Sequence, residues 1–187
     1  MGVRKLIYSM SVSLDGFIAG PGGDISWGAP DDELHRFHND RVREIGAHLL
    51  GRRLYETMTY WETATEDPSL SDVAREFAPI WLALPKVVFS TTLSEVAGNA
   101  RLATDPLADE VARLKAQPGK DIGVGGAGLA GACMELDLVD EVQLFICPVV
   151  LGGGTPFFPA LDRRIDLELL ETRTFGSRVV HLRYGRA

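Results

Sequence analysis

The stretch DIGVGGAGLAG, from Asp121 to Gly131, decides how the fold of this chain is interpreted. Gly123, Gly125 and Gly128 have the spacing G-x-G-x-x-G, which is typical of the dinucleotide-binding turn of a Rossmann fold. That turn opens the first βαβ unit, and an acidic residue ends the next strand. Here the glycines lie about two-thirds of the way along the chain, and the next expected strand, VQLFIC, is followed by PVVLGGG with no acid. The context therefore argues against a Rossmann fold.

What remains is a strand that ends in two adjacent glycines, Gly125 and Gly126, and then enters a helix. Glycines allow backbone to approach a ligand closely, and the N–H groups of a helix N-terminus attract anions. Tight packing of the strand against the helix explains the same residues equally well. The stretch alone leaves both interpretations open.

The residue pattern elsewhere predicts strands that alternate with helices. The expected strands cover residues 6–14, 48–51, 86–90, 121–126 and 141–150, and the expected helices cover residues 30–47, 52–63, 71–84, 105–117 and 129–139. Two alternating segments, 166–175 and 178–185, flank Gly176 and Ser177 and predict a C-terminal antiparallel hairpin. This order is typical of an α/β fold with a mixed, mostly parallel sheet covered on both faces. We expect a single domain over residues 1–187.

The composition excludes several classes of partner. The chain has 187 residues, a net charge of −7 and a pI near 5.1, which argues against a nucleic acid or an anionic membrane as partner. Cys133 and Cys147 stand in apolar surroundings, without the spacing of metal ligands, so we expect reduced thiols and no metal site. The N-terminal residues alternate and lack the continuous apolar run of a signal peptide, which predicts a cytoplasmic protein.

Two further strand ends carry groups that suit an anion. Arg52 and Arg53 follow Gly51 at the expected start of a helix, where the helix dipole disfavours cations unless an anion binds between them. An exposed pair that covers nearby acids is the alternative. Ser90 and Thr91 supply hydroxyls at the end of another strand, where α/β sheets bind ligands, although turn capping is also common for these residues.

In this order, the segments SVSLDGFIAGPGG (11–23), LLGRRLYE (49–56), KVVFSTTL (86–93) and the long stretch from Asp121 to Phe158 resemble the dihydrofolate reductase-like superfamily. The chain is most similar to the reductase domain of bacterial riboflavin-pathway deaminase–reductases and their stand-alone relatives. The resemblance covers nearly the whole chain. It implies a three-layer α/β/α sandwich on a mixed sheet of about eight strands, and relatives of this kind are often homodimers.

The resemblance also implies NADPH as the hydride donor and a set of residues that bind it. By position these are Ser11, Ile18, Gly51, Arg52, Arg53, Ser90, Thr91, Val124, Gly125, Gly126, Ala127, Gly128 and Leu129. A cis peptide can join the residues that correspond to Gly125 and Gly126. Trp27 and His35 fall in the expected substrate pocket, and Phe157 is a further candidate there, although core packing or a dimer contact explains it as well.

This chain departs from the family at three positions. Dihydrofolate reductases carry a carboxylate on the first helix that hydrogen-bonds the pterin, and the nearest slot here is His35, with no acid aligned. Leu54 stands where relatives often have Thr, and Thr91 stands where many have Arg, so preference for NADPH depends on Arg52 and Arg53. Asp15 is a candidate proton donor, with an Asp-Gly turn as the alternative. We expect an NADPH-dependent reductase that acts on a small pyrimidine- or pterin-like heterocycle. The alternative is a non-catalytic nucleotide-binding or dimeric scaffold protein with the same fold.

Overall fold

The centre of the molecule is a mixed sheet of eight strands in the order β5-β4-β3-β6-β1-β7-β10-β9. The computed structural model describes residues 3–187. The strands of this sheet are β1 (Leu6–Ser13), β3 (Ile45–Gly51), β4 (Lys86–Phe89), β5 (Ala100–Leu102), β6 (Asp121–Gly125), β7 (Glu141–Cys147), β9 (Leu167–Thr174) and β10 (Val180–Arg186). Neighbouring strands from β5 to β7 pair in parallel, whereas β10 runs antiparallel to both β7 and β9. The mixed, mostly parallel sheet and the C-terminal hairpin are therefore confirmed.

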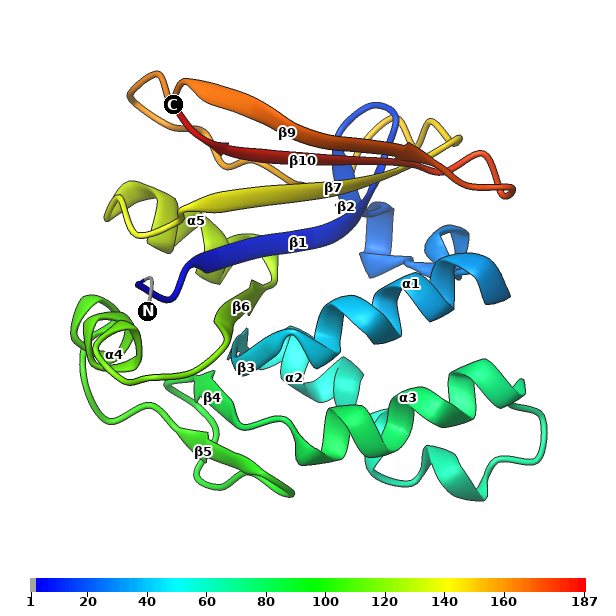
Figure 1. The fold of residues 1–187 in the computed structure, drawn as a ribbon, viewed down its shortest axis with the longest axis horizontal. Helices are drawn as coiled ribbons and strands as arrows, with labels where there is room; N and C mark the ends of the chain where they lie inside the picture. The colour runs from blue at the N-terminus through cyan, green and yellow to red at the C-terminus, as the bar shows by residue number, and fades with distance from the viewer. Residues whose placement is uncertain (1–2) are drawn as a thin grey trace.

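Helices cover both faces of this sheet (Figure 1). They are α1 (Asp32–Arg43), α2 (Arg52–Met58), α3 (Asp72–Ala83), α4 (Leu107–Lys115) and α5 (Ala127–Glu135). The buried residues of α4 and α5 form one core with alternate side chains of the central strands, while α1, α2 and α3 pack against the opposite face. Two layers of helix around one sheet make the predicted three-layer sandwich.

The helix ends follow from local sequence. The side chain of Asp31 accepts a hydrogen bond from the N–H of Leu34, and two acids occupy the first turn of α1. Ser71 caps α3 in the same way, through the N–H of Ala74. Such caps satisfy N–H groups that have no partner within the helix, so each of these helices begins directly after its cap. The predicted end of the first helix is wrong, because α1 ends at Arg43 and residues 45–47 belong to β3.

Two loops that carry family motifs meet above the sheet edge. The loop after β1 contains β2 (Phe17–Ala19) and two short 3-10 turns, Pro21–Gly23 and Ser26–Gly28. The loop after β7 contains β8 (Thr155–Pro156), which pairs antiparallel with β2. The sequence did not predict β2, β5 or β8, because strands of two or three residues carry no periodicity.

Candidate functional site

A cleft of about 730 Å³ opens at the sheet edge where β1, β3 and β6 end. We call it the main cleft. Most of the predicted cofactor and pocket residues line it: Ser11, Ile18, Trp27, Gly51, Arg52, Arg53, Gly126, Ala127, Gly128 and Leu129. Residues from five separate segments of the chain thus converge on one space, although their role as cofactor ligands stays a prediction.

Two helix N-termini border the main cleft. Gly51 precedes α2 and Gly126 precedes α5, and neither helix has a side-chain cap or an acid in its first turn. Gly51 packs close to Leu129, where an added Cβ would lie 3.7 Å from the Leu129 Cβ atom. Uncapped N–H groups and the positive ends of both helices therefore face the same region, which suits a phosphate-bearing ligand.

A shallower outer groove continues from the main cleft. Arg52 lines both spaces, and Ser90 and Thr91 line the outer groove together with Thr92 and Asp105. The Arg52 guanidinium also contacts the Glu56 carboxylate one helical turn away, at 3.0 and 3.2 Å. Of the two arginines, Arg52 is therefore the one that reaches the groove lined by Ser90 and Thr91.

An inner cavity of about 430 Å³ extends from the main cleft between α1 and the sheet. Met10, Ser11 and Leu54 line both spaces, so the two adjoin. The inner cavity is also lined by polar side chains that the sequence alone did not bring together: Ser9, His38, Arg41, Glu44, His48, Asp121, Glu141, Gln143 and Arg183.

The inner cavity exists because the central strands carry little bulk on this face. Gly123 and Gly125 alternate with the buried Val124, which points into the core on the opposite face. A Cβ atom at Gly123 would lie 2.7 Å from Cδ2 of His48, and one at Gly125 would collide with Leu54. The first two glycines of the motif thus make room for side chains of neighbouring elements.

The two histidines of the inner cavity are neutral. Burial lowers the pKa of His48 to about 4, and burial together with nearby histidines lowers the pKa of His38 to about 4. Nδ1 of His48 lies 3.2 Å from the carbonyl of Leu49, which leaves Nε2 as the acceptor nitrogen. Near pH 7 the inner cavity therefore offers hydrogen-bonding groups on its histidines without a charge.

Asp15 does not line the main cleft or the inner cavity. Its carboxylate accepts hydrogen bonds from Ser13 Oγ and from the backbone N–H groups of Leu151 and Gly152. These bonds hold its pKa below the ordinary value, so the group is ionised at neutral pH and has no proton to give. These bonds favour the turn interpretation of Asp15 over the role of proton donor.

Three other residues that the sequence analysis placed at the site do not line the main cleft. Phe157 is 1% exposed and stacks on Tyr8 in the core, with ring centroids 4.3 Å apart, so it is a core residue. Val124 belongs to the same core because strand alternation turns it away from the cleft. His35 is half-buried and packs against Trp61 and Phe77, outside the residues that line either space.

The peptide bond between Gly125 and Gly126 is trans, as are all peptide bonds within residues 3–187. The cis bond that the resemblance implied is therefore corrected. Gly126 instead has φ 88° and ψ 127°, a conformation that glycine adopts without the strain a side chain would bring. The change of direction from β6 into α5 occurs at this residue.

Within the described part of the chain, no group of three or more His, Cys, Asp or Glu side chains is arranged to hold a metal ion. None of the described helices is long and apolar enough to cross a membrane. Cys133 and Cys147 are both free and buried.

Solved structures of other proteins have the same fold as this chain. Dihydrofolate reductase from Enterococcus faecalis, complexed with NADP(H) and RAB-propyl, superposes with a TM-score of 0.62 at 16% identity, over 97% of this chain and 96% of that one. The deaminase and 5-amino-6-(5-phosphoribosylamino)uracil reductase from Thermotoga maritima gives a TM-score of 0.70 at 17% identity, over 98% of this chain and 57% of that one. The fold is thus that of a dihydrofolate reductase-like protein.

Sequence comparison narrows the class to one family. The family described as RibD C-terminal domain matches residues 4–181. YyaP of Bacillus subtilis (strain 168), an uncharacterized protein, is 38% identical over 182 residues, which cover 97% of this chain and 94% of YyaP. This chain belongs to the RibD C-terminal domain family, the reductase family that the motifs resembled.

Proposed function

We propose that the protein is an NADPH-dependent reductase that acts on a small heterocycle of the pyrimidine or pterin type. The observation that carries the proposal is that two spaces adjoin. The main cleft has two helix N-termini and two arginines, and it shares Met10, Ser11 and Leu54 with the inner cavity. A hydride can pass only between two molecules held in contact, and this arrangement provides adjoining compartments.

The residues of the main cleft fit a dinucleotide. The N–H groups at the start of α2 and α5, with Arg52 and Arg53, would hold its phosphates. Ser11 and Ile18 would border the nicotinamide at the junction with the inner cavity. A bound nicotinamide cofactor supplies the hydride, while the protein supplies position and electrostatics.

The residues around the junction control access of water. Trp27 and Ile25 come from the loop after β1 and Thr155 from the loop after β7, and all three line the main cleft. Leu54 and Met10 give the junction an apolar wall. A dry junction suits hydride transfer because water competes for reactive intermediates and weakens electrostatic interactions.

Cofactor binding provides the direct test. NADPH and NADH are titrated separately against the purified protein, with the fluorescence of its tryptophans as the signal, because Trp27 lines the main cleft. Saturable binding of NADPH, tighter than that of NADH, is the expected result. Absence of binding by both up to millimolar concentration would overturn the proposal.

A further inference from the structure

A further pocket, which we call the rear pocket, lies on the face of the sheet opposite the inner cavity. Its volume is about 250 Å³. On β7, Glu141 and Gln143 line the inner cavity, whereas Val142 between them lines the rear pocket, because successive side chains of a strand point to opposite faces. The rear pocket shares no lining residue with the main cleft, the inner cavity or the outer groove. It is therefore a space separate from the one proposed for cofactor and substrate.

Apolar side chains form both the floor and the outer wall of the rear pocket. The floor consists of three side chains that are at most 6% exposed, namely Met134 at the end of α5, Val139 and Val142. The outer wall comes from the loop after β8, through Phe158, Leu161 and Ile165. Phe158 is 42% exposed although buried apolar side chains lie beside it. A concave space of this kind suits an apolar ligand.

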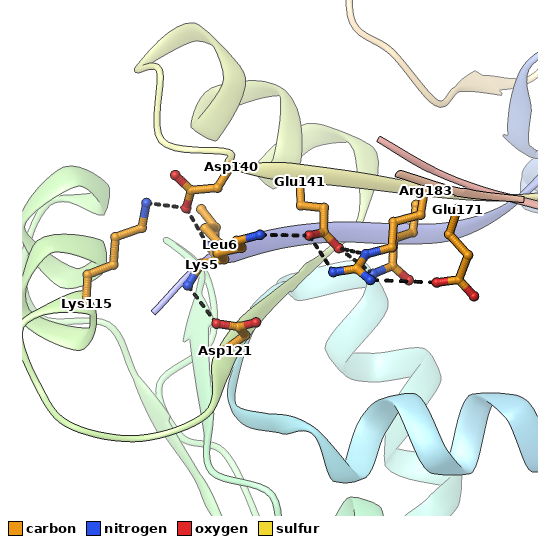
Figure 2. Close-up of polar contacts among 9 residues, drawn as sticks. Lys5, Leu6, Lys115, Asp121, Asp140, Glu141, Glu171 and Arg183 are labelled. Atoms are coloured by element: carbon orange, nitrogen blue, oxygen red, sulfur yellow. Dashed lines mark hydrogen bonds and ion pairs between the residues drawn. The ribbon is translucent and has the colours of Figure 1, made fainter. Parts of the chain in front are cut away.

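The charged groups at the rim of the rear pocket already have partners. The carboxylate of Asp137 accepts a hydrogen bond from Arg163 at 2.6 Å and lies 2.8 Å from Arg186. The carboxylate of Asp140 pairs with the Lys115 ammonium (Figure 2). A charged ligand would lose hydration and find no unpaired opposite charge among the described residues that line this pocket. The rim therefore favours an uncharged ligand.

The loop that forms the outer wall is held away from the floor. Pro159 packs on Gly131 of α5, where an added Cβ atom would lie 3.2 Å from the proline ring. Further along the loop, Arg163 donates to the carbonyl of Met134 at 2.7 Å. An apolar space that cannot collapse costs stability while it is empty, because the atoms that line it lack dispersion contacts. A ligand that fills the rear pocket restores those contacts.

A short segment joins the rear pocket to the main cleft. Thr155 lines the main cleft, and Phe158 lines the rear pocket. Between them, the ring of Phe157 contacts the Phe158 ring at a centroid distance of 4.8 Å, and its carbonyl accepts a hydrogen bond from the Tyr8 hydroxyl at 3.1 Å. Thr155 itself pairs with Ala19 of β2. A ligand that restrains the Phe158 ring thus also restrains the segment that forms one wall of the main cleft.

We propose that the rear pocket is an effector site for a small uncharged aromatic molecule of one or two fused rings, and that its occupant steadies the wall of the main cleft made by β2 and β8. An engineered apolar cavity of about 150 Å³ binds benzene. The rear pocket, at about 250 Å³, has room for a second fused ring. The inference does not depend on the proposed function, because it concerns a separate space.

Indole is the probe for this site because it is uncharged and bicyclic. It is titrated into the wild-type protein by calorimetry, in parallel with 2-aminobenzimidazole, which has a similar shape and is a cation in mildly acidic buffer. We expect saturable binding of indole with a dissociation constant below about 1 mM, and at least about tenfold weaker binding of the cation. Hydrogen exchange with mass spectrometry tests the effect on the main cleft. Indole should slow exchange in residues 157–167 and also in residues 17–19 of β2.

Variants that fill the rear pocket locate the bound indole. Val139→Phe adds an aromatic ring from the floor and should abolish indole binding. Leu161→Trp fills the same space from the loop, and it gives the same test if Val139→Phe fails to fold. Val150→Phe is the matched control. Val150 is 67% exposed and lies outside the lining, so this variant should bind indole as the wild type does.

Several results would overturn the inference. Indole binding that persists in both filled variants would mean that indole occupies another space, such as the inner cavity. Absence of binding to the wild type would overturn the inference directly. A wild-type dimer that dissociates in the filled variants, measured by light scattering, would make the rear pocket an interface between two copies of the chain. Binding without slower exchange in residues 17–19 would overturn the effector role. These measurements contain no NADPH, so their failure is distinct from failure of the proposed function.

Discussion

The carboxylate of Asp15 accepts a 2.7 Å hydrogen bond from the backbone N–H of Gly152, which lies 137 positions later in the chain. Leu151 donates to the same carboxylate at 3.1 Å, and Phe157 N–H donates to the Gly16 carbonyl at 2.8 Å. These bonds join the loop after β1 to the loop after β7. Because both loops supply walls of the main cleft, Asp15 acts on the site through their relative position.

Replacing Asp15 by Ala should loosen both loops. The backbone N–H groups of Leu151 and Gly152 would lose their acceptor, so we expect faster hydrogen exchange in residues 14–28 and 148–157 and weaker NADPH binding. Hydrogen exchange with mass spectrometry measures the first effect and fluorescence titration the second. Asp162→Ala, at an exposed acid of another loop, is the control and should change neither. Unchanged exchange in Asp15→Ala would show that the two loops are held by other contacts.

Arg52→Ala should weaken NADPH binding more than NADH binding. Arg52 lines both the main cleft and the outer groove, whereas Arg53 lines only the main cleft. A charged hydrogen bond to a phosphate is worth about 1.5–3 kcal/mol, so a loss of about tenfold or more for NADPH is expected. Arg53→Ala should weaken the two cofactors more equally. Dissociation constants for both cofactors, measured on both variants, check the difference.

Glu56→Gln tests the same assignment from the opposite direction. Glu56 holds the Arg52 guanidinium at 3.0 and 3.2 Å and competes with a bound phosphate for it. Removing the carboxylate should tighten NADPH binding several-fold and leave NADH binding nearly unchanged, and it should do so less at high salt. If Arg52→Ala lowers the affinity for NADPH and NADH equally, Arg52 does not bind the 2′-phosphate of NADPH.

The stability of the fold should decrease as the pH falls from about 6.5 to about 4. His38 and His48 have pKa values of about 4 in the folded protein, against an ordinary value of 6.5. Between these pH values the unfolded chain binds more protons than the folded one, so acid favours unfolding. Each histidine contributes up to about 1.4 kcal/mol per pH unit to the slope of the unfolding free energy against pH. Urea denaturation at several pH values measures the slope.

His38→Leu removes one of these groups and should reduce the slope of stability against pH in that range. His35 provides the matched control, since it lies on the same helix and the nearby carboxylate of Asp32 opposes the lowering of its pKa by burial. His35→Leu should therefore change the slope by a smaller amount. A slope in His38→Leu equal to that of the wild type would show that this ring is protonated in the folded protein.

Local chemistry explains which features could be predicted from the sequence. Asp31 and Ser71 cap the helices that follow them, and the alternation in β1 and in the C-terminal hairpin gives strands at the expected places. The sequence also predicted that Arg52 and Gly126 lie at one cleft, because parallel strands bring their carboxyl ends to one edge of the sheet. Each of these features depends on residues close in sequence or on a general rule of topology.

The inner cavity could not be predicted because it depends on register between distant strands. Gln143 lies opposite Ser9 only through the pairing of β7 with β1, and His48 lies over Gly123 only through the pairing of β3 with β6. Phe157 was assigned to a pocket, but the loop that carries it folds back so that its ring stacks on Tyr8. The small residues at alternate positions of β1 and β6 were a signal that one face of the sheet lacks bulk.

The glycines of the G-x-G-x-x-G pattern should respond to alanine in opposite ways. A Cβ at Gly123 would lie 2.7 Å from Cδ2 and 2.9 Å from Nε2 of His48, whose ring is confined by Trp81. Forced overpacking of this kind costs about 1–3 kcal/mol. A Cβ at Gly128 would meet nothing within 4 Å, and Gly128 lies within α5, so alanine there should stabilise the fold by about 0.5–1 kcal/mol.

Urea denaturation of Gly123→Ala and Gly128→Ala therefore distinguishes this fold from a dinucleotide turn of the Rossmann type. In that turn the third glycine allows close packing of helix on strand, so its replacement would be the costly one. Here the third glycine is free of contacts and the first makes room for His48. A Gly123→Ala variant as stable as the wild type would contradict this account. Partial recovery of stability in Gly123→Ala combined with His48→Ala would support it, because the smaller side chain gives back the space that the new methyl group takes.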